Sequence, residues 1–201
     1  YWQSILLKEA ILEQKNTFVD TECIYSWLPS TTEFSRQAIF KGRAPSADYD
    51  QNPKSESKLW NSFWNSNNIP SYKQSYTHDS ELIYNLSHEI VAYVSTDLDE
   101  KMHSSSNYYD LYDLTENWVQ HSDILLIISK LIGDGFSVFI TTDHGNVEST
   151  PYRSLNQYSK LCANFSLRHI TLPPGADRTV FLEEHGGNLL QINMNTNTFY
   201  M

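Results

Sequence analysis

Residues 124–145 read ILLIISKLIGDGFSVFITTDHG, and this stretch determines the expected fold. Apolar residues at helical spacing extend from Leu114 to Ile132, which predicts the longest helix of the chain. Gly133 and Gly135 end this helix, and the apolar run from Ser137 to Thr141 then predicts a strand. The carboxyl end of that strand leads directly into the polar sequence TDHG.

The alternation of helix and strand continues over the rest of the chain. Helices are expected from Trp2 to Lys15 and from Thr31 to Phe40, the second opened by a capping-box sequence, STTE, and closed by Gly42. Buried strands are expected from Cys23 to Leu28 and from Ile90 to Val94. The weaker patterns predict a polar loop over 44–57, helices over 59–64 and 81–86, a loop carrying Asp97, Asp99 and His103, and strands near 167–172, 179–182, 189–194 and 198–201. This order is typical of an α/β protein, with helices on the faces of a central sheet and one domain over 1–201.

Size and charge exclude several classes of protein. The 201 residues are 40% hydrophobic and 13% aromatic, which excludes collagen-like and wholly disordered chains. The formal net charge is −10, so a groove that held nucleic acid by its backbone would need added positive charge, and bound metal ions are one source. The alternative interpretation is that the negative charge serves only to keep the protein soluble.

Other features of the chain bear on its location. Cys23 and Cys162 match no metal-ligand spacing and are too few for a disulfide framework, which favours a reduced, cytoplasmic setting. No apolar run is long enough for a membrane span, and the N-terminus lacks the pattern of a signal peptide. Because residue 1 is not Met, we expect a piece of a longer protein.

Chemically active side chains follow three expected strands. Thr31 and Thr32 come after the first, Asp99 with His103 after the second, and Asp143 with His144 after the third. In an α/β sheet the carboxyl ends of the strands form the usual site, and a turn near His185 would return that residue to the same edge. Imidazole and carboxylate suit a pair of divalent ions of the zinc or manganese kind.

Each of these signals has an ordinary alternative. A single histidine is more often a surface or core residue than a ligand. The sequence STTE is fully explained as a helix cap. However, a hydroxyl on the first helical turn also lies beside free backbone N–H groups, where phosphate binds, and a metal-bound Thr there would be a nucleophile.

Four segments together resemble a known family. These are LPSTTEFSR at 28–36, with AIF at 38–40 and Gly42 after it, the D-x-x-x-H pattern at 99–103, TTDHG at 141–145 and EHGG at 184–187. The residues of these four segments, and the order of the segments along the chain, resemble those of PglZ domains, which belong to the alkaline phosphatase superfamily.

The resemblance implies a ligand set. Thr32 would be nucleophile and ligand, and Asp143 and His144 would hold the same ion. The second ion would be held by Asp99, His103 and His185. A further Asp ligand is expected on a strand preceding residue 1, so the alkaline-phosphatase-like sheet would lack its first strand in this chain. Arg36, one helical turn past Thr32, would contact phosphate or form a surface salt bridge.

The implied function is that of a metal-dependent phosphohydrolase, a phosphodiesterase or phosphatase using two divalent ions, with zinc favoured over manganese or magnesium. The expected substrate is a phosphoester, with nucleotides or oligonucleotides as candidates. Partners would be other components of a BREX-type phage-defence or signalling assembly in the cytoplasm. The alternative is a non-catalytic PglZ module that binds such partners. Sulfatase chemistry is disfavoured because Thr32 cannot become formylglycine, and phosphomutases need extra domains.

Overall fold

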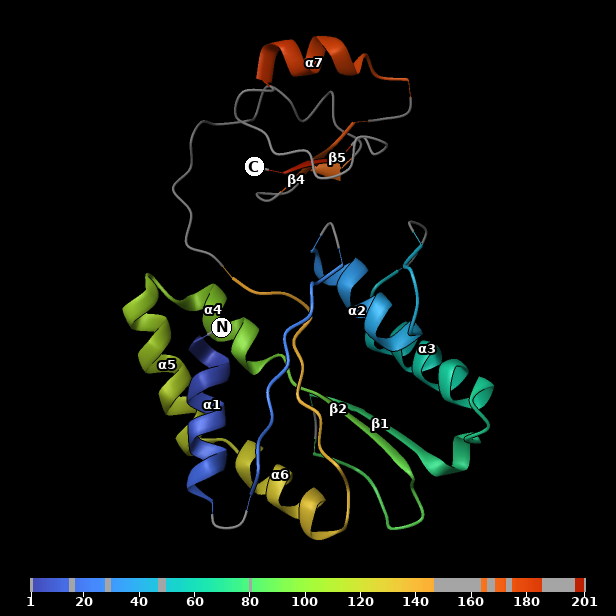
Figure 1. Cartoon of the computed structure of the whole chain (residues 1–201), viewed down its shortest axis with the longest axis vertical. Coiled ribbons are helices and arrows are strands. Elements are labelled where there is room, and N and C mark those ends of the chain that lie inside the picture. Colours follow the sequence, from blue (N-terminus) through green and yellow to red (C-terminus); the bar gives the residue numbers. More distant parts are fainter. Residues whose placement is uncertain are drawn as a thin grey trace. The chain divides into compact units, whose positions relative to one another are not determined.

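A computed structural model gives the fold of the chain (Figure 1). It describes residues 2–14, 17–27, 30–46, 50–79, 81–146, 164–165, 169–172, 175–185 and 198–200. The chain divides into two compact units, Tyr1–Glu148 and Ser149–Met201. One domain over 1–201 stays a prediction.

The first unit combines helices with a parallel pair of strands. Its helices are α1 (Trp2–Glu13), α2 (Thr32–Lys41), α3 (Pro53–Ser66), α4 (Asp97–Ser104), α5 (Tyr108–His121) and α6 (Ile124–Gly133), with a short 3₁₀ turn, η1 (Ser71–Lys73). Strands β1 (Gln74–His78) and β2 (Ile90–Val94) pair in parallel, from Gln74 opposite Ile90 to His78 opposite Val94. A parallel pair needs a crossover, and residues 79–89 provide it.

The second unit contains a small antiparallel sheet and one helix. Strands β3 (Asn164–Phe165), β4 (His169–Thr171) and β5 (Thr198–Tyr200) are ordered β3-β4-β5, and the helix is α7 (Arg178–His185). Leu172 and Phe181 are buried in the fold. Along the described residues of both units, no helix has the length and apolarity needed to cross a membrane.

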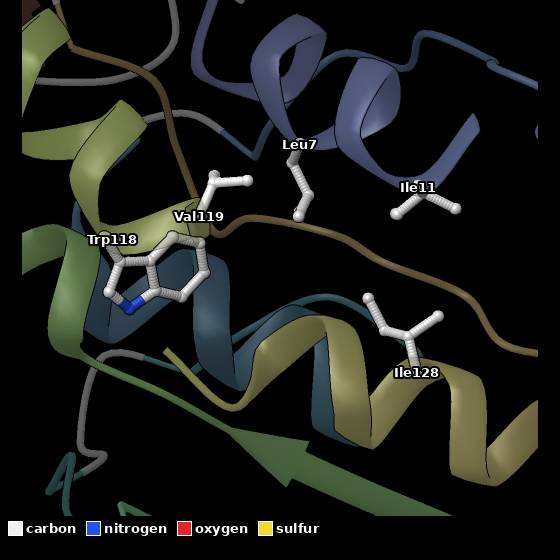
Figure 2. Close-up of a cluster of buried hydrophobic side chains, with 5 residues drawn as sticks. All are labelled: Leu7, Ile11, Trp118, Val119 and Ile128. Atoms are coloured by element: carbon white, nitrogen blue, oxygen red, sulfur yellow. The ribbon is translucent and has the colours of Figure 1, made fainter. Parts of the chain in front are cut away.

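A buried hydrophobic cluster joins α1, α5 and α6. Leu7 and Ile11 of α1 pack with Trp118 and Val119 of α5 and with Ile128 of α6 (Figure 2). Burying a side chain of this kind contributes about 1.5–3 kcal/mol to folding. The cluster therefore fixes the N-terminal helix against a region more than a hundred residues further along the chain.

A separate layer of aromatic rings packs α2 and α3 onto β1. The rings of Phe40, Trp60, Phe63, Trp64 and Tyr76 meet edge to face, with centroids 5.0 to 6.0 Å apart. Such pairs add about 0.5–1.5 kcal/mol each beyond the burial of their area. This packing holds the start of α2 in place relative to α3.

Gly42 ends α2 and allows this close approach. Its φ is +63°, the left-handed region that glycine adopts without strain. A Cβ at this position would lie only 2.3 Å from Cε2 of Phe63. The prediction of a glycine C-cap is confirmed, since the Gly42 N–H donates to Ala38 O at 2.9 Å.

Two predicted strands are wrong. Residues 23–27 have no regular secondary structure, and Ile24 is 90% exposed, whereas Leu28 lies outside the described residues. Residues 137–141 are likewise irregular and Phe139 is 92% exposed, although Val138 packs against the core. An apolar run becomes a strand only when a neighbour pairs with its backbone, and neither segment has such a neighbour among the described residues.

The expected long helix is divided in two. Ser122, with φ −83° and ψ 164°, is extended and separates α5 from α6. Serine followed by aspartate favours helix ends over helix interiors, because both side chains compete for backbone hydrogen bonds.

Other boundaries also differ from those predicted. The expected loop bearing Asp97 is helix α4, and α3 begins inside the predicted loop over 44–57 and extends the predicted helix over 59–64. No helix occurs over 81–86, strand β1 was not predicted, and residues 179–182 are helical rather than a strand.

Several predicted elements are present. The helix from residue 2 is confirmed to Glu13, and Lys15 lies outside the described residues. Strand β2 has the predicted bounds, and strands near 169–171 and 198–200 are confirmed, whereas 189–194 also falls outside the described residues. The mixture of helices with a parallel strand pair agrees with the α/β class. In the described part of the chain, this parallel sheet has two strands rather than the larger central sheet expected.

Candidate functional site

Thr32 is the first residue of helix α2. The N-cap is Thr31, extended at φ −90° and ψ 154°, and its side chain makes no capping hydrogen bond. The helix therefore begins at Thr32, one residue after the predicted start at Thr31. The first-turn N–H groups of a helix have no acceptor within the helix, and the helix dipole adds positive potential there, so a helix N-terminus suits an anion.

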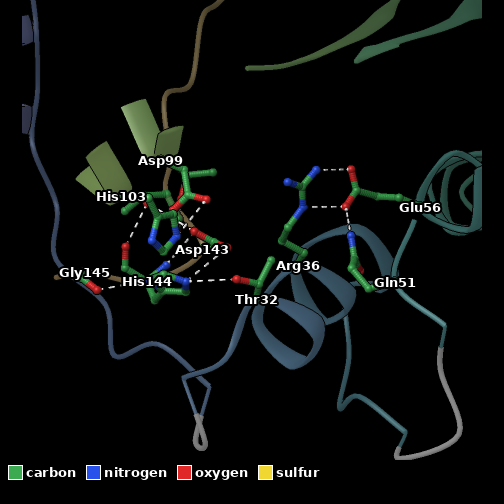
Figure 3. Close-up of polar contacts among 11 residues, drawn as sticks. Thr32, Arg36, Gln51, Glu56, Asp99, His103, Asp143, His144 and Gly145 are labelled. Atoms are coloured by element: carbon green, nitrogen blue, oxygen red, sulfur yellow. Dashed lines mark hydrogen bonds and ion pairs between the residues drawn. The ribbon is translucent and has the colours of Figure 1, made fainter. Parts of the chain in front are cut away.

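His144 contacts the Thr32 hydroxyl. His144 Nε2 lies 3.1 Å from Thr32 Oγ1, and the His144 side chain is only 8% exposed (Figure 3). The other ring nitrogen, Nδ1, is 3.0 Å from Gly145 O, which can only accept. We therefore assign the ring proton of the neutral imidazole to Nδ1, so that Nε2 accepts the Thr32 O–H.

Asp143 completes this cluster. Its Oδ2 is 3.6 Å from His144 Nε2, and its Oδ1 accepts the His144 backbone N–H at 2.9 Å. Thr142 Oγ1 donates to His144 O at 2.9 Å, which holds the backbone around Asp143 in place. A carboxylate oxygen, an unprotonated imidazole nitrogen and a hydroxyl oxygen thus converge.

Asp99 and His103 form a second, exposed pair. They lie four residues apart on α4, which places them on one helical face, with His103 Nε2 3.6 Å from Asp99 Oδ2. The His103 side chain is 71% exposed. The resemblance assigned both residues to one ion, and on helix α4 they lie one turn apart rather than in the expected loop.

The predicted ligands are only partly brought together. In the part of the chain that the structure describes, no group of three or more His, Cys, Asp or Glu side chains could hold a metal ion. Asp143 with His144 and Asp99 with His103 are therefore two separate pairs. His185 is the last residue of α7 in the second unit, and its association with either pair stays a prediction.

Arg36 is held in a buried ion pair. Its Nε and Nη2 donate to Glu56 Oε2 and Oε1, both at 2.6 Å, and Glu56 is fully buried. Tyr76 Oη and Gln51 Nε2 also donate to this carboxylate, at 2.5 and 2.7 Å. The alternative of a surface salt bridge for Arg36 is wrong, because both partners are shielded from water. A phosphate contact by Arg36 stays a prediction.

The charges of this network are strongly favoured. Burial alone would raise the pKa of Glu56, but hydrogen bonds from Arg36, Tyr76 and Gln51 bring that pKa below its ordinary value. Burial alone would lower the pKa of Arg36, yet Glu56 raises it, and the charge of Asp143 adds to the effect. The pair is therefore ionised across the physiological range.

Sequence reasoning missed Glu56, Gln51 and Tyr76. The first two lie in or beside the expected polar loop, and Tyr76 lies on the unpredicted strand β1. An Arg and a Glu twenty residues apart give no periodic signal, because only the packing of α2 on α3 brings them together.

A cavity of about 590 Å³ lies elsewhere, at the carboxyl ends of β1 and β2. Its lining includes Asp79, Tyr93, Asp97, Asp123 and Lys130. Burial raises the pKa of Tyr93, and the negative charges of the three aspartates raise it further. None of the predicted site residues lines this cavity, so it is separate from the Thr32 cluster.

Comparison with known proteins gives one finding. A family model described as the BREX system PglZ alkaline phosphatase-like domain matches residues 2–160. Comparisons with curated proteins and with solved structures give no match. The matched stretch includes every predicted site residue except His185.

Proposed function

Because this chain belongs to the PglZ family, whose domain is alkaline phosphatase-like, we propose that it is a metal-dependent phosphohydrolase. Its substrate would be a phosphoester, either a diester or a monoester. The observation that carries the proposal is the contact between the Thr32 hydroxyl and His144 Nε2, with the Asp143 carboxylate beside it.

The donor atoms of this cluster fit a cation. Thr32 Oγ1 and Asp143 Oδ2 carry lone pairs, as does His144 Nε2 in the tautomer assigned above, and Asp143 Oδ2 lies 3.6 Å from His144 Nε2. Nitrogen and oxygen donors of this kind suit zinc or manganese. Thr32, Asp143 and His144 would hold one divalent ion, and Asp99, His103 and His185 would hold the second. Such ions supply charge stabilisation for a deprotonated hydroxyl and for phosphoryl oxygens.

The residues of the chain then have distinct roles. Thr32 Oγ1 attacks phosphorus, the bond from phosphorus to the leaving oxygen breaks, and the hydroxyl proton ends on the leaving alcohol. His144 Nε2 orients the hydroxyl before attack. Water then attacks the phosphothreonine, which restores Thr32 and releases the phosphate product.

The positive groups near Thr32 favour an anionic substrate. Arg36 lies one helical turn further along α2, and the N-terminus of the helix carries partial positive charge. Because Glu56 balances the charge of Arg36, the helix N-terminus and bound metal ions would be the local positive charges that oppose the net charge of −10, which otherwise repels a nucleotide or an oligonucleotide. We propose the same substrate classes as the sequence suggested, and a place in a BREX-type defence assembly.

A second candidate is a non-catalytic PglZ module that binds partner proteins. It is favoured by the separation of the two acid–histidine pairs among the described residues, where no three such side chains could hold a metal ion. In this case Thr32 would be a helix-start residue, and metal ions would have no catalytic effect.

An assay with three chromogenic esters tests the proposal. The chain is incubated with zinc, manganese or magnesium and with bis-nitrophenyl phosphate, nitrophenyl phosphate or nitrophenyl sulfate. We expect metal-dependent release of nitrophenol from at least one phosphate ester, no release from the sulfate, and loss of activity with a chelator. A folded chain that cleaves neither phosphate ester with any of these metals would favour the partner-binding module.

A further inference from the structure

The Glu56 carboxylate is fully buried and fully bonded. It accepts from Arg36 Nε and Nη2, from Tyr76 Oη and from Gln51 Nε2, all at 2.5 to 2.7 Å. Removing a carboxylate from water is costly, and a buried ion pair is often no more stabilising than apolar side chains of the same volume. The four hydrogen bonds therefore indicate a role beyond stability.

The arrangement leaves one edge of Arg36 available. Nε and Nη2 face Glu56, and in the described part of the chain no hydrogen bond is made by Nη1. Arg36 follows Thr32 by four residues on α2, so both side chains lie on one face of the helix. In Figure 3 the third guanidinium nitrogen lies on the side away from Glu56, toward the cluster that contains Thr32 and His144.

Glu56 also keeps Arg36 from pairing with Asp143. The charge of Asp143 raises the pKa of Arg36, so the two groups are near enough to attract each other. Yet within the described residues Arg36 forms its ion pair with Glu56 and none with Asp143. Without Glu56, the attraction of Asp143 would act on a guanidinium that no ion pair holds in place.

We propose that Glu56 is a positioning residue, which locks the Arg36 guanidinium so that its free Nη1 edge binds an oxygen of the phosphoryl group at Thr32. Tyr76 and Gln51 hold the Glu56 carboxylate in the orientation that this requires. The inference rests on the proposed function, because it needs a phosphoryl group beside Thr32. It adds three residues, from α3, β1 and the segment before α3, that support the site without touching the substrate.

Binding of inorganic phosphate to the metal-loaded chain tests this role. Arg36→Ala should weaken phosphate binding about tenfold or more, as expected for a charge-assisted contact. Glu56→Gln should cause a similar loss, and the double variant should bind no more weakly than Arg36→Ala alone. Glu89→Gln is the matched control, because it makes the same substitution in the exposed ion pair with Lys73 and should leave phosphate binding unchanged.

Two further measurements separate positioning from folding. Added guanidinium should restore phosphate binding to Arg36→Ala, where Glu56 remains to hold it, but not to the double variant. If circular dichroism shows that Glu56→Gln is unfolded, Tyr76→Phe takes its place, and it should weaken phosphate binding severalfold while keeping the Arg36 pair.

The outcomes distinguish the two proposals. If the parent chain neither cleaves phosphate esters nor binds phosphate, the proposed function fails. If the parent does both, but Glu56→Gln and Tyr76→Phe bind phosphate as the parent does, the positioning role is wrong. Additive losses in the double variant, or equal rescue of both variants by guanidinium, would also overturn it.

Discussion

The two acid–histidine pairs have the same contact distance but different surroundings. In each, a histidine Nε2 lies 3.6 Å from an aspartate Oδ2. His144 is nearly buried and bonded at both ring nitrogens, whereas His103 is mostly exposed and its described contact is with Asp99. Distance alone therefore does not indicate a functional site. The Asp143 pair is fixed before any ligand arrives, while the Asp99 pair is held only by its helix.

The sharpest test of this difference is to remove the Thr32 hydroxyl, which contacts His144 of the buried pair. Thr32→Ala should lower kcat for phosphate-ester cleavage by at least about 10³-fold, because the proposed nucleophile is lost. Thr31→Ala is the matched control, since its neighbouring hydroxyl makes no capping hydrogen bond and its loss should change kcat little. The measurement is steady-state kinetics with bis-nitrophenyl phosphate. Equal kcat values for the two variants would remove the nucleophile role and, with it, the distinction between the pairs.

The next effect concerns the contribution of the buried Arg36–Glu56 ion pair to the stability of the fold. Glu56→Gln leaves the buried Arg36 charge without its partner, and we expect it to lower the free energy of unfolding by about 3–5 kcal/mol. Urea unfolding followed by circular dichroism measures this loss. Glu89→Gln, in the exposed ion pair with Lys73, should unfold close to the parent midpoint, and an equal shift in both variants would contradict the importance of burial.

A smaller effect should appear in acid. The pKa of Glu56 is lowered in the folded chain from its ordinary 4.5, so its ionised form stabilises the fold above that pH. This contribution is lost as the pH falls through the folded pKa. The difference in unfolding free energy between the parent and Glu56→Gln should therefore narrow below about pH 4.5. A difference that stayed constant down to the acid transition would show that the carboxylate charge is not responsible.

The smallest effect on stability is expected at the exposed pair. Asp99→Asn and His103→Ala should each change the free energy of unfolding by less than about 0.5 kcal/mol, because solvent screens this contact. Calorimetric titration with zinc or manganese should nevertheless show weaker binding of one ion. A large loss of stability without any change in ion binding would mean that the Asp99–His103 pair is structural and does not hold an ion.

The sequence predicted the local parts of the site well. Helix α2 was identified from its start signal and from Gly42, because capping acts over a few neighbouring residues. The D-x-x-x-H pattern at 99–103 placed Asp99 and His103 together, and they lie one helical turn apart on α4. These features depend only on interactions between residues that are close together in the sequence.

Contacts between distant segments could not be predicted in the same way. Glu56 was assigned to a polar loop, because its charge gives no sign that α2 and Tyr76 will cover it. Segments 23–27 and 137–141 were read as strands from their apolar residues, although strand formation also depends on a pairing partner elsewhere. The resemblance to PglZ domains, by contrast, rested on several motifs in order, and the family match over 2–160 confirms it.

The separation along the chain of the two main polar contacts has a consequence for folding order. Arg36 and Glu56 are 20 residues apart, whereas Thr32 and His144 are 112 apart, so the second contact closes a much longer loop. We expect the α2–α3 ion pair to form early during refolding and the Thr32–His144 contact to form only after α1 has met α5 and α6. Pulse-labelling hydrogen exchange would resolve these two stages. A partly folded chain would then carry the arginine proposed to bind phosphate but no oriented hydroxyl, so the proposed hydrolysis would begin only when folding is complete.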